Sequence, residues 1–174
     1  KYVLPLLLSV LLIATLVTCD LPVHCLFHQI QGDWELRLGP SGQSNNVVNT
    51  CALNSTVNVK QTIRVTLDSP DVVRNSAGVN IGFWTLIYDQ GFEIVFKGVS
   101  YFAFFNYTQQ GDTVVSHCDR TFTGWYHTDE VKSSDWGCFS AMKVNSNPLI
   151  PATNEHKVQP FSAQNDEVFK NDHT

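Results

Sequence analysis

The sequence lacks the short motifs that usually mark a catalytic or metal site. Its six histidines are scattered apart from the pair His24 and His28, and its five cysteines include no C-x-x-C pair, so a full set of closely spaced metal ligands is not found. No serine stands in a G-x-S-x-G context, and no cysteine stands in a papain-like C-G-S-C-W context. The sequence therefore predicts no metal site and no catalytic residue of its own.

Positive charge is also scarce. Eleven Lys and Arg residues against sixteen Asp and Glu give a formal net charge of −5, and the basic residues form no cluster. Nucleic-acid binding requires a concentrated positive surface, so a nucleic-acid partner is not expected. Long helical periodicity is absent too, and no stretch has the pattern of a membrane-surface helix.

The one long apolar run lies at the N-terminus, in "KYVLPLLLSVLLIATLVTC". A leading Lys, an apolar core from Val3 to Val17 and an end at Thr18-Cys19 are typical of a secretory signal peptide. A transmembrane anchor would need about 20 apolar residues and a charged flank. We therefore predict a signal peptide over residues 1–19, with cleavage near Cys19.

Cysteine number fits a secreted chain. Loss of Cys19 with the signal peptide would leave four cysteines, enough for two disulfides, and spacing alone leaves all three pairings open. Two N-x-[ST] sequons, at Asn54 and Asn106, predict N-glycosylation of the same kind of chain.

Apolar residues recur with period two from Gly32 onward, as they do in a strand with one buried face. Eight strand-like stretches follow one another, separated by short connections such as Asp89-Gln90-Gly91 and Gln110-Gly111-Asp112 that favour hairpins. They are 32–39, 57–68, 82–88, 92–97, 101–107, 113–118, 121–127 and 136–144. We predict an all-β domain, an eight-stranded antiparallel up-and-down barrel, because closure removes exposed edges.

The domain is expected to cover residues 20–144. After about Val144 the periodicity stops, and "NSNPLIPATNEHKVQPFSAQNDE" has three prolines and many polar residues, which is the composition of a linker.

The Gly32-x-Trp34 pair on the first strand resembles the G-x-W signature of lipocalins. It leaves open an alternative function, a secreted barrel that binds an apolar small molecule. A third hypothesis is an inhibitor-like or structural β-domain. Dense aromatics in "YFAFFNY" are compatible with all three, since such side chains form cores and interfaces alike.

Several longer stretches carry a more specific resemblance. "CDLPVHC", "GDWELRLG", "LIYDQGFEIVFKGVSYFAFFNY", "TFTGWYHTDE" and "DWGCFSAMKV" resemble the exclusion domain of the cathepsin C, or dipeptidyl peptidase I, family from Cys19 to about Val144. "VFKNDH" near the end resembles the start of that family's activation peptide, so residues 145–174 would be linker and the beginning of that peptide. The papain-like part, with its catalytic Cys, His and Asn, is not among these residues.

The resemblance implies a set of roles. Cleavage would make Asp20 the first residue of the mature protein, and the disulfides would join Cys25 to Cys118 and Cys51 to Cys138. The barrel would block the non-primed end of a papain-like groove, helped by a hairpin at about residues 106–117. The sequon at Asn106 is a departure from the family, and a glycan there would sit at the base of this hairpin. Asp20 would bind the free N-terminus of the substrate, so that dipeptides are released.

The resemblance also implies partners and a location. The domain would act with the heavy and light chains of the papain-like catalytic domain of the same precursor, on peptide N-termini. The assembly would be a homotetramer that binds chloride in its papain-like part. It would reside in the lysosome or a secretory granule, or be released from the cell.

Overall fold

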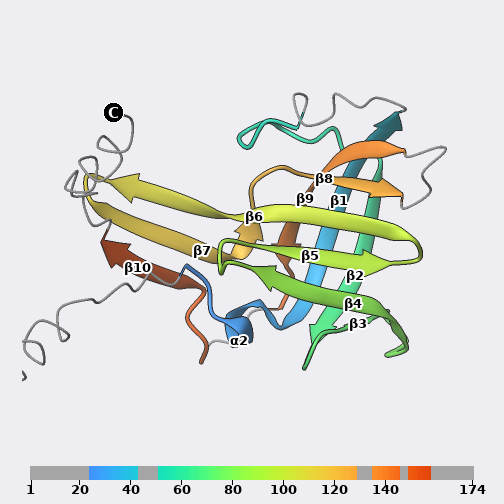
Figure 1. Cartoon of the computed structure of the whole chain (residues 1–174), viewed down its shortest axis with the longest axis horizontal. Coiled ribbons are helices and arrows are strands. Elements are labelled where there is room, and N and C mark those ends of the chain that lie inside the picture. Colours follow the sequence, from blue (N-terminus) through green and yellow to red (C-terminus); the bar gives the residue numbers. More distant parts are fainter. Residues whose placement is uncertain (1–23, 43–50, 129–134, 146–148, 158–174) are drawn as a thin grey trace, which may run out of the picture.

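The computed structural model describes residues 24–42, 51–128, 135–145 and 149–157. These residues form one short helix and ten strands (Figure 1). The elements are α2 (Phe27–Ile30), β1 (Gly32–Gly42), β2 (Gln61–Asp68), β3 (Val72–Arg74), β4 (Asn80–Ile87), β5 (Gly91–Phe96), β6 (Val99–Gln110), β7 (Thr113–Thr121), β8 (Gly124–Thr128), β9 (Trp136–Lys143) and β10 (Thr153–Lys157).

Eight of the strands close into a barrel. Their order is β1-β2-β3-β4-β5-β6-β8-β9, and β9 pairs back with β1, where Leu36 lies opposite Ala141. All of these pairings are antiparallel. The predicted fold class, an all-β eight-stranded antiparallel barrel with two disulfides, is confirmed.

The membership of the barrel differs from the expected one at one strand. The stretch expected at 113–118 belongs to β7, which leaves the barrel, and β3 takes the eighth place. β3 has only three residues, too few for an alternating pattern to be recognised in the sequence. β6 has twelve residues and outgrows the barrel: its first part pairs with β8, and its last part pairs with β7.

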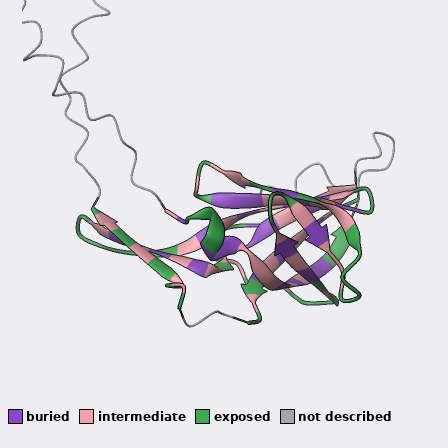
Figure 2. Cartoon of the chain, turned by 90° about the horizontal axis from the view of Figure 1, so that it is seen from below, coloured by how far each residue is buried: buried purple, intermediate pink, exposed green. Residues whose placement is uncertain are grey.

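The barrel interior is filled by side chains from alternate positions of its strands, seen as buried segments in Figure 2. Trp34 is fully buried, contacts Phe92 edge to face, and donates its indole N–H to the carbonyl of Ile30 at 2.7 Å. Its position next to α2 closes that end of the core. The remaining large buried side chains are Leu36, Leu67, Val73, Trp84, Phe92, Ile94, Tyr101, Phe105, Tyr126 and Phe139.

Burial has an electrostatic consequence within this core. It is the main cause that raises the pKa of Tyr101 to about 12, with the nearby Tyr126 adding to it. Tyr126 uses its own hydroxyl to donate to the carbonyl of Gly39 at 3.0 Å, which ties β8 to β1 across the barrel. Both tyrosines therefore act as neutral core side chains.

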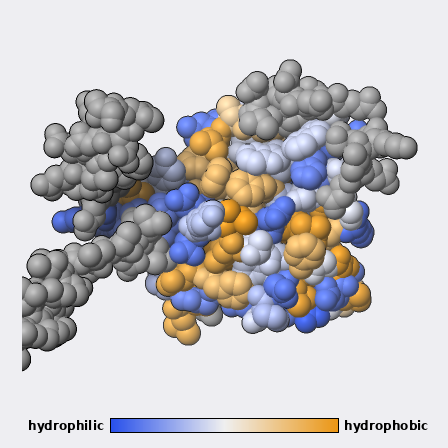
Figure 3. All heavy atoms as spheres, in the orientation of Figure 1, coloured by the Kyte–Doolittle hydropathy of each residue, from blue (hydrophilic) through white to orange (hydrophobic). Residues whose placement is uncertain are grey.

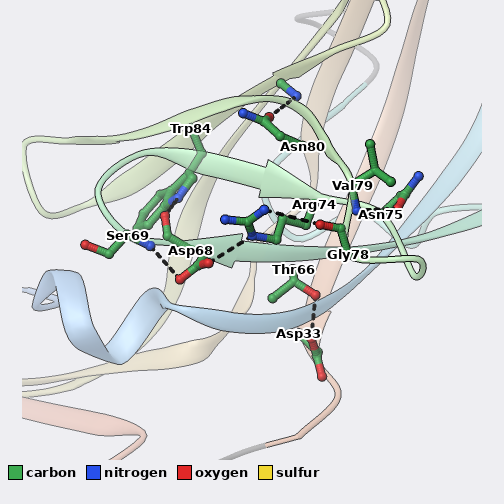
Figure 4. A network of polar contacts seen from close by, with 11 residues as sticks. Asp33, Thr66, Asp68, Ser69, Arg74, Asn75, Gly78, Val79, Asn80 and Trp84 are labelled. Atoms are coloured by element: carbon green, nitrogen blue, oxygen red, sulfur yellow. Dashed lines mark hydrogen bonds and ion pairs between the residues drawn. The ribbon is translucent and has the colours of Figure 1, made fainter.

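Polar contacts hold the short strand β3 in place (Figure 4). The carboxylate of Asp68 accepts from the backbone N–H of Ser69 and from Arg74, while its carbonyl accepts from the indole of Trp84 at 2.9 Å. Nearby, Thr66 donates to Asp33 at 2.7 Å and joins β2 to β1. Because β3 is short, these local hydrogen bonds help to hold it in the sheet.

Outward-facing residues of the barrel are mixed in character. Figure 3 shows hydrophobic and hydrophilic residues interspersed over the visible face of the barrel. This fits the period-two pattern, in which every second residue faces outward.

A strand also forms inside the stretch whose composition predicts a linker. β10 pairs with β7 in antiparallel register, from Thr153 opposite His117 to Lys157 opposite Thr113. Proline-rich composition hid this strand, because its pairing partner lies about 40 residues earlier and its own five residues alternate only between exposed and half-buried positions.

Candidate interaction site at the hairpin and the N-terminal arm

A three-stranded projection extends beyond the barrel (Figure 1). It consists of the end of β6, most of β7, and β10 alongside β7. Its tip is the turn at Gly111, where φ is +57°. We call residues 106–117 the hairpin, the range for which the family resemblance implies a blocking role.

A disulfide joins the start of the described chain to this projection. Cys25 and Cys118 are bonded with their Cα atoms 5.7 Å apart, and both are buried. The backbone N–H of Cys25 donates to Asp89, and that of Cys118 donates to Ala152 just before β10. Residues 20–25 are called the N-terminal arm here, and its described end, His24 and Cys25, is therefore anchored to β7 one residue beyond the hairpin.

Polar side chains reinforce this anchor. The imidazole Nδ1 of His24 lies 3.3 Å from the hydroxyl of Ser116 on β7. The amide of Asn154 donates to the carbonyl of His24 at 3.0 Å and to the side chain of Gln29 at 2.7 Å, and Gln29 donates to the carbonyl of Pro151. The arm, α2, β7 and β10 thus form one connected unit.

The two faces of the hairpin have different neighbours. Directly paired residues of antiparallel strands project to the same face, and successive residues project to opposite faces. Tyr107 pairs with Ser116, while Asn106 pairs with His117. Because Ser116 contacts His24, the face that carries Tyr107 is the arm face, and Asn106 belongs to the opposite face.

Two histidines meet where the arm touches β10. The ring centroids of His24 and His156 are 4.5 Å apart, and Nδ1 of His156 is buried without a hydrogen-bond partner among the described residues. Burial first, and then His156, lower the pKa of His24 from its ordinary value of 6.5, while Asp89 opposes the shift. The neutral imidazole is therefore the form that fits this contact.

Acid is expected to weaken the attachment of β10. A depressed pKa in the folded state means that the contribution of His24 is fully present above about pH 6.5 and is lost as the pH falls below it. Hydrogen exchange of the β10 amides, corrected for intrinsic rates, should show more opening at about pH 5 than at about pH 7.5.

Matched variants identify the source of that effect. In His156→Gln the extra opening at low pH should shrink, because His156 is one of the groups that lower the pKa of His24. His28→Gln changes an exposed histidine on α2 and should leave the pH dependence as it is. Equal pH dependence in wild type and His156→Gln would contradict the role of the His24 and His156 pair.

The sequence-predicted site residues fall into three groups. Asp20 lies outside the described residues. The cysteines pair as the resemblance implied, Cys25 with Cys118 and Cys51 with Cys138. Both sequon asparagines are described, Asn54 exposed in a turn and Asn106 half-buried on β6.

Sequence reasoning missed the residues that hold the arm. They are His24, Gln29, Ser116, Asn154 and His156. The hydrogen bonds among the first four span 92 to 130 positions along the chain, and His156 contacts His24 through its ring. Only His24 offered a local signal, because it directly precedes Cys25, a cysteine expected to form a disulfide. The rest depends on β10, which the composition had hidden.

The packing of side chains inside the barrel bears on the alternative function, a barrel that binds an apolar small molecule. Trp34, Phe92 and Phe139 are fully buried in the hydrophobic core inside the barrel. Their side chains occupy space that would be the ligand cup of a lipocalin-like barrel.

His24 and His28 are four residues apart, yet the described residues contain no group of three or more potential metal-binding side chains. Among the described residues, no helix has the length and apolar character needed to cross a bilayer.

Comparison with known proteins agrees with this architecture. The family model of the cathepsin C exclusion domain matches residues 20–143. The chain belongs to this family.

A curated relative extends the comparison. "Cathepsin C" of Schistosoma mansoni is 29% identical over 117 residues, which are 67% of this chain and 23% of the relative. The matched residues thus cover about a quarter of that protein's length.

Proposed function

We propose that this domain turns a papain-like peptidase into a dipeptidyl peptidase, by blocking the non-primed end of its groove and binding the substrate's free N-terminus. The observation that carries the proposal is the covalent connection of two elements. Cys25 at the end of the arm is bonded to Cys118, one residue beyond the hairpin, and His24 contacts Ser116 within the hairpin. The hairpin that blocks the groove and the Asp20 carboxylate that binds the substrate's N-terminus would therefore be positioned together.

Chain length supports a role for Asp20 at the hairpin. Asp20 precedes His24 by four residues, so their Cα atoms can be no more than about 14 Å apart even in a fully extended chain. Pro22 restricts the backbone between them. We propose that this reach lets the Asp20 carboxylate lie at the arm face of the hairpin.

The proposed chemistry of Asp20 explains why two residues are removed from the substrate's N-terminus. A papain-like groove binds extended peptides and has no intrinsic reason to count from an end. A wall limits how far the substrate reaches, and a carboxylate at the wall pairs with the α-ammonium two residues before the scissile bond. Such a charge-assisted hydrogen bond contributes about 1.5 to 3 kcal/mol.

The same proposal includes the setting of the domain. Its partner would be the papain-like catalytic domain of the same precursor, in a homotetramer with chloride bound in the papain-like part. Two disulfides are consistent with a protein of the secretory pathway. A lysosome or secretory granule would supply both the peptides and the acid that loosens β10.

Asp20→Asn in the full-length precursor tests the role of this carboxylate. We expect kcat/KM on peptides with a free N-terminus to fall by about 10- to 100-fold, which corresponds to about 1.5 to 3 kcal/mol. Cleavage of N-acetylated peptides should persist or rise, because it gains nothing from the ion pair. N-terminal sequencing of the mature variant establishes that residue 20 is still exposed.

Asp71→Asn is the matched control. It removes one exposed carboxylate between β2 and β3, from a residue that belongs to neither the arm nor the hairpin. Its kcat/KM on free N-termini should equal that of the wild type. If Asp20→Asn behaves like Asp71→Asn, the proposed receptor for the N-terminus is wrong.

A further inference from the structure

Both sequon asparagines border one surface groove. A cavity of about 380 Å³ lies outside the barrel, and Asn54 and Asn106 both contribute to its lining although they are 52 positions apart in the sequence. The other lining residues are Arg37, Leu53, Ser55, Thr56, Val57, Val59, Thr121, Phe122, Thr123 and Ser140. No motif in the sequence foretells that the two sites meet.

The segment that carries Asn54 is held firmly against the barrel. The Cys51–Cys138 disulfide attaches it to β9, and Thr123 bonds it twice, through its backbone N–H to the carbonyl of Leu53 and through its hydroxyl to the carbonyl of Ser55. Asn54 itself is exposed in a turn closed by a hydrogen bond from Ser55 to Ala52. Its side chain is thus accessible at the rim of a rigid groove.

The lining suits a sugar. Ser140 brings a hydroxyl group and Thr121 brings a second, which already accepts from the backbone N–H of Ala141. The Phe122 ring, which packs edge to face on Tyr107, brings an aromatic surface. Leu53 and Val59 are nearly half-exposed, at 46% and 45%, and would lose water contact under a ligand. A pyranose ring, apolar on its faces and hydroxylated around its rim, matches this mixture.

We propose that this groove is the seat of the chain's own N-linked glycans, with the first N-acetylglucosamine residues on Asn54 and Asn106 packed over Phe122 and the 53–59 segment. The glycosylated surface is then a solvent face of the assembled enzyme. It agrees with the hairpin geometry, because Asn106 projects away from the face that contacts the arm. A glycan at the base of the hairpin is therefore compatible with docking through the arm face.

Occupancy is tested on the secreted full-length precursor. Asn54→Gln and Asn106→Gln should each remove one glycan, seen as a mass shift by intact-mass or peptide mass spectrometry. A secreted wild-type protein without glycan at either position would overturn the proposal.

Seating is tested by the rate at which peptide N-glycosidase releases each glycan from the native protein. A third glycan introduced at the exposed hairpin tip by Gly111→Asn, which creates a sequon with Thr113, is the internal standard. We expect release from Asn54 and Asn106 to be about 10-fold slower than release from the tip, a factor that disappears after denaturation.

Phe122→Ala separates seating from general inaccessibility. It removes the aromatic floor of the groove, so release from Asn54 and Asn106 should accelerate about 10-fold while release from the tip is unchanged. Equal native release rates at all three sites, or no acceleration in a folded Phe122→Ala protein, would overturn the seat. Aminodipeptidase activity is measured on the wild type and on Phe122→Ala with Gly111 unchanged, because a tip glycan would lie on the proposed blocking hairpin. Its retention keeps this result separate from the test of Asp20.

Discussion

Replacing Cys25 and Cys118 together by alanine is expected to abolish the preference for free N-termini while also lowering the free energy of unfolding by about 4 kcal/mol. The stability loss follows from the loop of about 93 residues that the disulfide closes, because an open chain has more conformations when unfolded. The functional loss follows from the arm. Without its covalent link to β7, the arm would lose the anchor on which the proposed role of Asp20 depends.

The second disulfide provides a control with nearly equal stability cost. Cys51 and Cys138 are 87 positions apart, against 93 for the first pair, so the chain-entropy term is almost the same. It attaches the 51–60 segment to β9 and does not touch the arm. The Cys51→Ala, Cys138→Ala protein should therefore unfold as easily as the first variant but still release dipeptides at temperatures where it is folded.

Denaturant titration and the ratio of kcat/KM on free and N-acetylated peptides measure the two effects. Matching stability losses with different ratios would support positioning of Asp20 by the Cys25–Cys118 bond. The same ratio in both double variants would show that the disulfide contributes stability alone.

Gly124→Ala is expected to prevent the barrel from closing. A Cβ at Gly124 would lie 2.2 Å from the carbonyl oxygen of Phe102 and 2.6 Å from the Cβ of Ala103. Both belong to β6, and a backbone oxygen cannot move aside as the end of a flexible side chain can. Since β6 and β8 are paired here, relief of the clash would break the ladder.

We expect this variant to lose about 3 kcal/mol or more of stability, at the upper end of the cost of overpacking. Gly42→Ala is the control, because a Cβ there meets nothing within 4 Å and its φ is not positive. It should change stability by less than about 0.5 kcal/mol. Urea unfolding of both proteins, followed by tryptophan fluorescence, checks the difference; equal midpoints would contradict the close approach of β8 to β6.

Gly124 also shows why the hairpin leaves the barrel where it does. The first part of β6, from Val99 to Phe102, pairs with β8, and from Phe105 onward β6 pairs with β7, with an irregularity between Phe105 and Asn106. β8 begins at Gly124, so β6 loses its barrel neighbour beyond that level. The rest of β6 is then free to carry β7 and β10 as the projection.

Sequence patterns were most informative where a local period reports burial. The alternation around Trp34 and Val65 predicted β1 and β2, and the buried residues are the ones the period assigns to the inner face. β2 nevertheless starts at Gln61 and not at residue 57, because the stretch before it is tied to β9 through Cys51 and lines the groove. An alternating pattern cannot show which of two surfaces a segment packs on.

The pattern was least informative for short or isolated strands. β3 and β10 have three and five residues and depend on neighbours distant in sequence, so their own residues carry almost no signal. β10 in particular lies in proline-rich surroundings and is fixed by Asn154, through partners on the arm and α2.

The sequence by itself determined the all-β class, the count of cysteines available for two disulfides, and the family, since these follow from local periodicity, composition and contiguous motifs. Only the tertiary structure decided which strand leaves the barrel, that His24 meets Ser116 and His156, and that Asn54 and Asn106 share a groove. The reason is physical. Period-two alternation says which side of a strand is buried, whereas strand order and register bring together residues that no local pattern connects.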